Sequence, residues 1–344
     1  MYTERKKLYE KLEENLDSKI VLYATSDRRG AETQIGQDVI DIFIAQLDKI
    51  GVTKKISLIL YTRGGDTAAA WNLVNLLKQF CDEFQVIIPH RAHSAGTLIS
   101  LGANSIIMTK QATLSPIDPS VNTPLNPIAQ TGQMAIQMPV SVEAIKGYLA
   151  FAREELSIED DLALSNIMVK LSEKIHPLVL GQVFRARMQI KMLGEKLLSQ
   201  QVSDTNKMKE ILSFLCSDSG SHDYTINRRE ARDVLGLNII KPDEEMYAII
   251  KAIYDDFSKE LGFGMPFNPV TMSQTTKDST YYVKRALVES LDGGADYLSV
   301  EGKIIRMAVA VGSPVGLPAM PTGAGLPPQQ IREERLFEGW KHES

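Results

Sequence analysis

The first third of the chain alternates short apolar runs with segments whose apolar residues recur at helical spacing. The apolar runs have the length and composition of buried strands, and they cover residues 19–24, 55–61, 84–88 and 105–109. The segments 35–50 and 68–80 predict helices, because their apolar residues fall on one helical face. Strands and helices in alternation favour a largely parallel sheet flanked by helices, and therefore an α/β fold.

A different pattern follows residue 124. We expect an irregular lobe or a hairpin as far as residue 139, and long helical material rich in leucine from 160 to 201. The remaining pattern predicts helices at 142–155, 207–217, 229–235, 244–261 and 281–291, an extended piece at 223–226 and a last strand at 304–311.

These elements predict one main domain from residue 17 to residue 311, preceded by a lead-in helix at residues 1–16. A helical insertion is expected around residues 156–217. Prolines and glycines crowd the start of the segment 312–344. Because such a composition does not bury a core, we predict a disordered tail there.

Composition and charge narrow the class of protein. The chain is 44% hydrophobic and 24% charged, which is typical of a soluble globular protein. Its net charge of −5 gives no reason to expect a nucleic-acid partner. Two cysteines, Cys81 and Cys216, do not make a disulfide framework. No run reaches the roughly 18 apolar residues of a membrane span, and no apolar stretch follows the charged N-terminal segment, so we expect a cytoplasmic protein.

The most informative stretch is the corner around Ser94, which joins the apolar run 84–88 to a helix-like run at 97–103. A serine flanked by small residues at such a corner has its hydroxyl beside backbone N–H donors and the positive end of a helix dipole. Taken alone, the same pattern also suits a helix N-cap. A second feature, at the end of the run 55–61, favours a reactive serine.

Gly64 and Gly65 follow that run and open the next helix. The carboxyl ends of parallel strands meet at one edge of a sheet, so this pair should lie near Ser94. Paired glycines let a backbone approach a ligand closely, and neither the phosphate-loop nor the dinucleotide-binding glycine pattern is present. The amide of Gly64 or Gly65, together with that of Ala95, would bind the oxyanion formed when Ser94 attacks a carbonyl carbon.

The chain resembles the serine dehydrogenase proteinase family of the Clp/crotonase superfamily, which is related to signal-peptide-peptidase-type serine proteases. The resemblance spans about residues 15–240 and rests on four segments, Tyr61–Gly65, Ala92–Thr97, Leu114–Pro119 and His222–Ile226. It implies a Clp/crotonase-like layered β-β-α spiral with added helices, and assembly into homo-oligomers. It also implies an ATP-independent serine endopeptidase that acts on polypeptides through Ser94.

The general base is left open between Lys146 and His222. No histidine lies between His93 and His176, so the catalytic histidine of Clp proteins has no counterpart. Lys146 would suit the serine–lysine pairing of signal-peptide-peptidase relatives, but it lies in a predicted helix, where a lysine is ordinarily solvated. His222 suits base chemistry near neutral pH, or it holds a loop carbonyl. Asp118, in a turn framed by prolines, would orient a histidine or cap the turn.

Two other functions stay open at this point. One is a non-catalytic oligomeric scaffold of the same fold. The other is a crotonase-type acyl-CoA enzyme that uses the same oxyanion site on a thioester, although no basic cluster for the CoA phosphates is evident. We expect no cofactor and no metal, because the chain has neither an HExxH motif nor clustered His and Cys ligands. The sequence does not decide whether an ATPase or a membrane protein is a partner.

Overall fold

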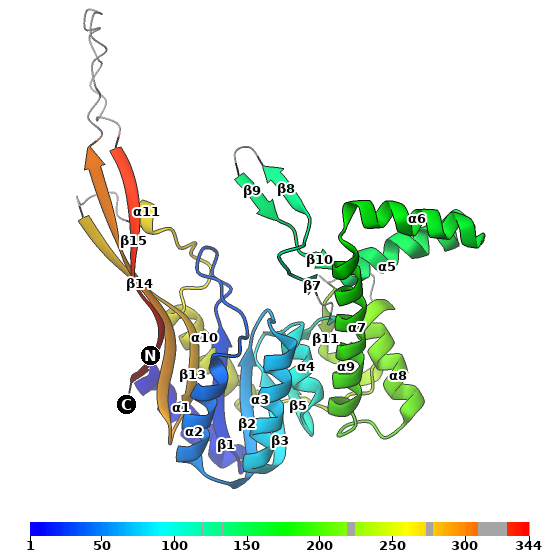
Figure 1. The fold of residues 1–344 in the computed structure, drawn as a ribbon. Coiled ribbons are helices and arrows are strands. Elements are labelled where there is room, and N and C mark those ends of the chain that lie inside the picture. Colours follow the sequence, from blue (N-terminus) through cyan, green and yellow to red (C-terminus); the bar gives the residue numbers. More distant parts are fainter. Residues whose placement is uncertain (118–119, 132–133, 219–223, 273–277, 309–328, 344) are drawn as a thin grey trace, which may run out of the picture.

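The structure, a computed structural model, is shown in Figure 1 and describes residues 1–117, 120–131, 134–218, 224–272, 278–308 and 329–343. In this part of the chain the largest sheet has eight strands. Their order across the sheet is β12 (Ile239–Ile240), β5 (Ser105–Met108), β3 (Cys81–Ile88), β2 (Thr53–Tyr61), β1 (Lys19–Thr25), β13 (Asp278–Ser290), β14 (Gly294–Ala308) and β15 (Gln329–Glu343).

The half of the sheet from β12 to β1 is parallel, as predicted. Alternate side chains of β1 enter two different cores. Val21 and Tyr23 face α2 (Val39–Ile50) and α3 (Thr67–Phe80), whereas Ile20 and Leu22 face α1 (Tyr2–Leu16) and α10 (Glu244–Glu260). Because helices cover both faces, these strands are continuous apolar runs without alternation. The order of layers is helices, sheet and helices, which confirms the α/β class.

A second, small sheet gives the fold its spiral character. It contains β11 (Ile226–Asn227), β6 (Thr113–Leu114) and β4 (Arg91–Ala92). A complete turn of the spiral adds one strand to the large sheet, a short one to the small sheet, and then a helix. The clearest turn is β3, β4 and α4 (Ala95–Leu101), and the preceding turn forms an isolated bridge between Thr62 and Ala92 before α3. After β11 the chain continues through α9 (Arg228–Asp233) into β12. This repetition confirms the predicted layered β-β-α spiral.

The added helices project from this body, at the right of Figure 1. Residues 142–198 are called the helical arm below, and they comprise α5 (Val142–Ala150), the π-helix η1 (Phe151–Glu155), α6 (Asp161–Lys174) and α7 (Pro177–Leu198). A small core connects the arm to β7 (Ser120–Val121) and β10 (Val140–Ser141), and its buried members are Val121, Val140, Val142, Val179 and Val183.

Several shorter elements complete the described part of the chain. The hairpin of β8 (Ile128–Thr131) and β9 (Met134–Gln137) precedes it, in agreement with the expected hairpin. Helix α8 (Thr205–Ser213) and the π-helix η2 (Phe214–Asp218) follow it, and α11 (Pro269–Met272) precedes β13. Among the described helices, none combines the length and the apolar content needed to span a lipid bilayer.

Two predictions for the C-terminal third are wrong. The segment 281–291 is not a helix, because residues 281–290 belong to β13, which pairs antiparallel with β1 and with β14. Residues 329–343 are not a disordered tail, because they form β15 against β14. The indole N–H of Trp340 also donates to Asp38 at the start of α2, at 2.7 Å. Prolines and glycines are concentrated before residue 329. Because the prediction used the composition of the whole segment 312–344, it missed the strand at the end of that segment. Residues 309–328 lie outside the described residues.

Candidate active site

Ser94 lies at the corner between β4 and α4 in a strained backbone conformation. Its φ is 51° and its ψ is −112°, which places a non-glycine residue in the positive-φ region that L-residues disfavour. Such outliers cost about 1 to 3 kcal/mol and cluster at functional sites. Although Ser94 occupies the N-cap position of α4, its side chain caps nothing. Among the described residues its hydroxyl has no hydrogen-bond partner, so the N-cap alternative does not explain this serine.

The glycine pair at the end of β2 lies directly against this corner. A Cβ added to Gly64 would lie 2.7 Å from the Cβ of Ser94, and one added to Gly65 would lie 2.3 Å from the carbonyl oxygen of Ile35. Both glycines also have positive φ, 114° and 148°. Two independent constraints, space and conformation, therefore require glycine at both positions. The predicted proximity of Gly64 to Ser94 is present in the structure.

The backbone amides around Ser94 are not equally available. The amide of Gly64 already donates to the Thr62 hydroxyl at 3.0 Å. The amides of Gly65 and Ala95 donate to no described residue. Ala95 is the first residue of α4, where a helix leaves its N–H groups without intrahelical acceptors. Of the three predicted oxyanion donors, Gly65 and Ala95 thus have the free N–H groups.

The buried hydroxyls of Ser115 and Thr97, which the sequence analysis did not assign, hold the Ser94 corner through hydrogen bonds. The amide of Ser94 donates to the Ser115 hydroxyl at 2.8 Å. The Thr97 hydroxyl donates to the Ser115 carbonyl at 2.8 Å and accepts from the Ser115 amide at 3.1 Å. Both side chains lie within the motifs that carried the family resemblance. Spacing alone did not indicate that they contact one another.

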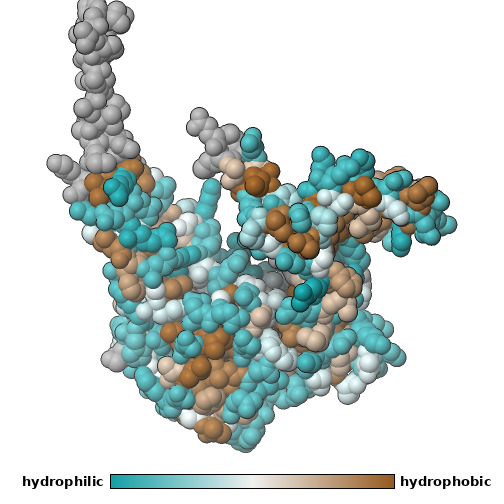
Figure 2. Space-filling view, viewed as in Figure 1, coloured by the Kyte–Doolittle hydropathy of each residue, from teal (hydrophilic) through white to brown (hydrophobic). Residues whose placement is uncertain are grey.

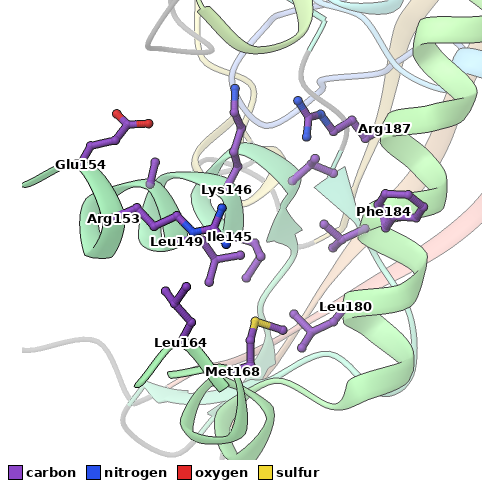
Figure 3. Close-up of a pocket in the computed structure, with 13 residues that line it drawn as sticks. Ile145, Lys146, Leu149, Arg153, Glu154, Leu164, Met168, Leu180, Phe184 and Arg187 are labelled. Atoms are coloured by element: carbon purple, nitrogen blue, oxygen red, sulfur yellow. The ribbon is translucent and has the colours of Figure 1, made fainter. Parts of the chain in front are cut away.

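The structure does not bring a general base to Ser94 within the described residues. Lys146 lies on α5 with its side chain 38% exposed and its amine 3.9 Å from the Glu143 carboxylate. In Figure 3 it extends to the rim of a cavity in the helical arm. The Ser94 hydroxyl makes no hydrogen bond to it. The other two candidates, Asp118 and His222, lie outside the described residues.

The two histidines nearest in sequence to Ser94 have other contacts. His93 Nε2 lies 2.9 Å from the Thr113 hydroxyl oxygen. The His90 ring stacks on Tyr254 with centroids 5.4 Å apart. Burial and the neighbouring Arg91 lower the pKa of His90, against a smaller opposing effect of Asp27. The His90 ring therefore packs against α10, which carries Tyr254.

The segment that contains the candidate site is similar to a family of known proteins. Residues 41–136, which include Ser94 and both glycines, match the family described as ClpP-like SDH-type serine proteinase. Two uncharacterized proteins of Methanocaldococcus jannaschii are similar to the chain. One is 31% identical over 58% of this chain and 58% of its own length, and the other is 30% identical over 54% and 51%. The matches thus span little more than half of these relatives.

Two solved structures that are similar to the chain have lower sequence identity. A membrane-bound stomatin-specific protease in mutant form is 16% identical, with 67% of this chain and 81% of that chain covered and a TM-score of 0.36. ClpP1 from Listeria monocytogenes is 14% identical, with 68% and 98% covered and a TM-score of 0.36.

Proposed function

We propose that this chain, whose residues 41–136 match the family described as ClpP-like SDH-type serine proteinase, hydrolyses peptide bonds through an acyl-enzyme on Ser94. One observation carries the proposal. Ser94 is held at a φ of 51°, its hydroxyl is unpaired among the described residues, and two free amides lie on adjoining backbone. A structural serine has no need of this strain, whereas a nucleophile gains a fixed direction of attack.

The reaction follows from these positions. The Ser94 oxygen attacks the carbonyl carbon of a peptide bond and gives its proton to the base. The amides of Gly65 and Ala95 donate to the oxyanion that forms on the carbonyl oxygen. The protonated base then gives that proton to the leaving amine as the peptide bond breaks. A water molecule, deprotonated by the same base, finally hydrolyses the Ser94 ester.

A fluorophosphonate probe tests the nucleophile. The folded wild-type chain is expected to be labelled, and Ser94→Ala is expected to lose the label together with peptide hydrolysis. Ser203→Ala, which removes an exposed serine outside the site, serves as the matched control and should label normally. Labelling that persists in Ser94→Ala contradicts the proposal. Folded wild-type protein that neither labels nor hydrolyses peptides would instead favour a non-catalytic scaffold.

The base is tested by Lys146→Met and His222→Ala. A general base contributes about 100- to 10,000-fold to the rate, so the variant that lacks it should lose activity on this scale. The other variant should stay near wild type. The pH profile of kcat/KM gives a second readout, because a histidine base ionises near neutral pH and a lysine base only at higher pH unless burial lowers its pKa. If both variants keep full activity, neither residue is the base.

A further inference from the structure

The helical arm contains an open cavity that is mostly apolar. Its volume is about 540 Å³, and residues of α5, η1, α6 and α7 line it. Figure 3 shows apolar side chains around the cavity, among them Leu149, Leu164, Met168, Leu180 and Phe184. Apolar surface is visible over this part of the arm in Figure 2. A volume of this size is typical of sites that hold a small molecule.

Helix α6 forms one wall of the cavity and has little packing of its own. None of its side chains is buried against the residues that the structure describes. Its apolar residues Leu164 and Met168 line the cavity, and Met168 is 40% exposed. Most helical stability in proteins comes from packing an apolar face, so an apolar occupant of the cavity would supply the cover that α6 lacks.

The cavity offers few hydrogen-bond partners other than its charged side chains. No serine, threonine, asparagine or glutamine is among the described residues that line it. Its walls are helical, so their backbone groups are largely engaged within the helices. A peptide bound here in extended form would bury backbone N–H and C=O groups without partners, which is unfavourable. An alkyl chain has no such groups, and the lining therefore favours an alkyl chain over an extended peptide.

The charged side chains of the cavity favour an anion. They are three cations and one acid, namely Lys146, Arg153, Arg187 and Glu154. These residues carry a formal charge of +2, whereas the whole chain carries −5. Even with Glu143, whose carboxylate lies 3.9 Å from the Lys146 amine, the balance stays positive. In Figure 3, Lys146 and Arg187 extend toward the same side of the cavity. The cavity thus has a cationic side as well as apolar walls.

We propose that this cavity binds a single-chain anionic amphiphile, of which a fatty carboxylate is the simplest example. The anionic head pairs with Arg187 and Lys146, and the alkyl chain lies along the apolar side chains of α5, α6 and α7. Arginine suits such a head, because its guanidinium can donate two parallel hydrogen bonds to one carboxylate. The proposal concerns binding and does not depend on the chemistry of Ser94.

Calorimetric titration of the full chain with octanoate, decanoate, dodecanoate and tetradecanoate, each below its micelle-forming concentration, provides the test. We expect saturable binding whose Kd falls about fourfold for each added methylene until the alkyl chain fills the cavity. Decanol has the same tail as decanoate but no negative charge. It should bind at least about tenfold more weakly, because it cannot form charge-assisted hydrogen bonds.

Two pairs of variants on α7 locate the site. Arg187→Met should weaken dodecanoate binding at least about tenfold, whereas Arg185→Met removes an exposed arginine that does not line the cavity and should have no effect. Phe184 lines the cavity but is 63% exposed, so Phe184→Ser removes little internal packing and should also weaken binding. Its control is Met192→Ser, on an exposed residue outside the cavity. Lys146 is left intact, because it is also a candidate base.

Several results would overturn the proposal. One is wild-type protein that binds none of the four carboxylates. Another is an affinity that does not change with chain length or that decanol matches. Binding that both Arg187→Met and Phe184→Ser retain in full would place the ligand elsewhere. Binding to vesicles of phosphatidylcholine and phosphatidylglycerol, without binding of the monomeric carboxylates, would assign the arm to a membrane surface instead.

Discussion

At the scale of single residues, the conformation of Ser94 depends on groups that lie far apart in the chain. Its amide is held by the Ser115 hydroxyl at 2.8 Å. On the other side, Gly64 leaves space for the Ser94 side chain that no other residue would leave. A positive φ at a non-glycine residue costs about 1 to 3 kcal/mol, so these contacts must supply that free energy. Ser115 and Gly64 therefore fix the direction in which the hydroxyl points.

Gly64→Ala should lower the rate of peptide hydrolysis sharply while it reduces the free energy of unfolding only moderately. The new Cβ would displace the Ser94 side chain, and a shift of about 1 Å in a reacting group can cost about 100-fold in rate. Gly51→Ala is the matched control, because Gly51 also has a positive φ, 74°, but open space around it. Both variants should lose about 1 to 2 kcal/mol in the free energy of unfolding. Only Gly64→Ala should lose peptide hydrolysis, and equal activities would show that the close approach to Ser94 is unimportant.

Part of this site could be predicted from residue types and spacing. The Ser94 corner and the glycine pair follow strands of a parallel sheet, and topology alone brings such ends together. The sequence could not predict which of the three amides are free to bind an oxyanion. That depends on the Thr62 hydroxyl, which accepts a hydrogen bond from the Gly64 N–H. Ser115 and Thr97 were also missed, since their roles arise from contacts between segments with no common sequence pattern.

At the scale of elements, a buried ion network attaches α1 to the body. The Arg5 side chain is fully buried, and its Nε donates to Glu289 at 2.9 Å. Its Nη1 lies 2.8 Å from a carboxylate oxygen of Glu260, which also pairs with Lys284. Burial alone would raise the pKa of Glu260, but the effects of Arg5 and Lys284 prevail and lower it. Helices α1 and α10 and strand β13 are thus connected through one guanidinium group.

Arg5→Met should destabilise the chain by about 3 to 5 kcal/mol at neutral pH, because it leaves buried carboxylates without their counter-charge. The sign of the pH effect follows from the lowered pKa of Glu260. This contribution is complete above the unfolded-state pKa and is lost as pH falls through the folded-state value. The difference between wild type and variant should therefore shrink in acid. Urea unfolding at several pH values measures it.

Lys11→Met, an exposed change on the same helix, is the control and should stay within about 0.5 kcal/mol of wild type. A difference between Arg5→Met and wild type that does not vary with pH would show that packing of the Arg5 stem, and not its charge, holds α1 in place.

The same network explains why the elements were predicted unevenly. The strands from β12 to β1 are covered by helices on both faces, so their sequences are plainly apolar. In β13, the buried Glu289 and the partly buried Lys284 interrupt the alternation that identifies a strand, because both are paired with charges from other elements. Strand β15 is mostly exposed and is ordered by its backbone pairing with β14. Neither feature can be recognised from local hydrophobicity.

At the scale of the whole molecule, α7 joins the helical arm to the Ser94 corner. Its N-terminal half lines the cavity of the helical arm. Its C-terminal end packs on α4, the helix that begins after Ser94. There Leu197 lies close to Gly102, and a Cβ at this glycine would be 2.9 Å from the Leu197 side chain. One continuous helix of 22 residues therefore connects the cavity of the arm with the helix that begins after Ser94.

The position of β1 in the sheet has a consequence for biosynthesis. One of its edges pairs with β2, which is made shortly afterwards, but its other edge pairs with residues 286–290 of β13. Until residues 286–290 have been synthesised, one edge of the apolar strand β1 has no strand to pair with. Open edges of this kind invite pairing with other chains. A fragment that ends before β13 would contain the whole Ser94 corner and still be prone to aggregate, so shortened versions intended to isolate the site need β13.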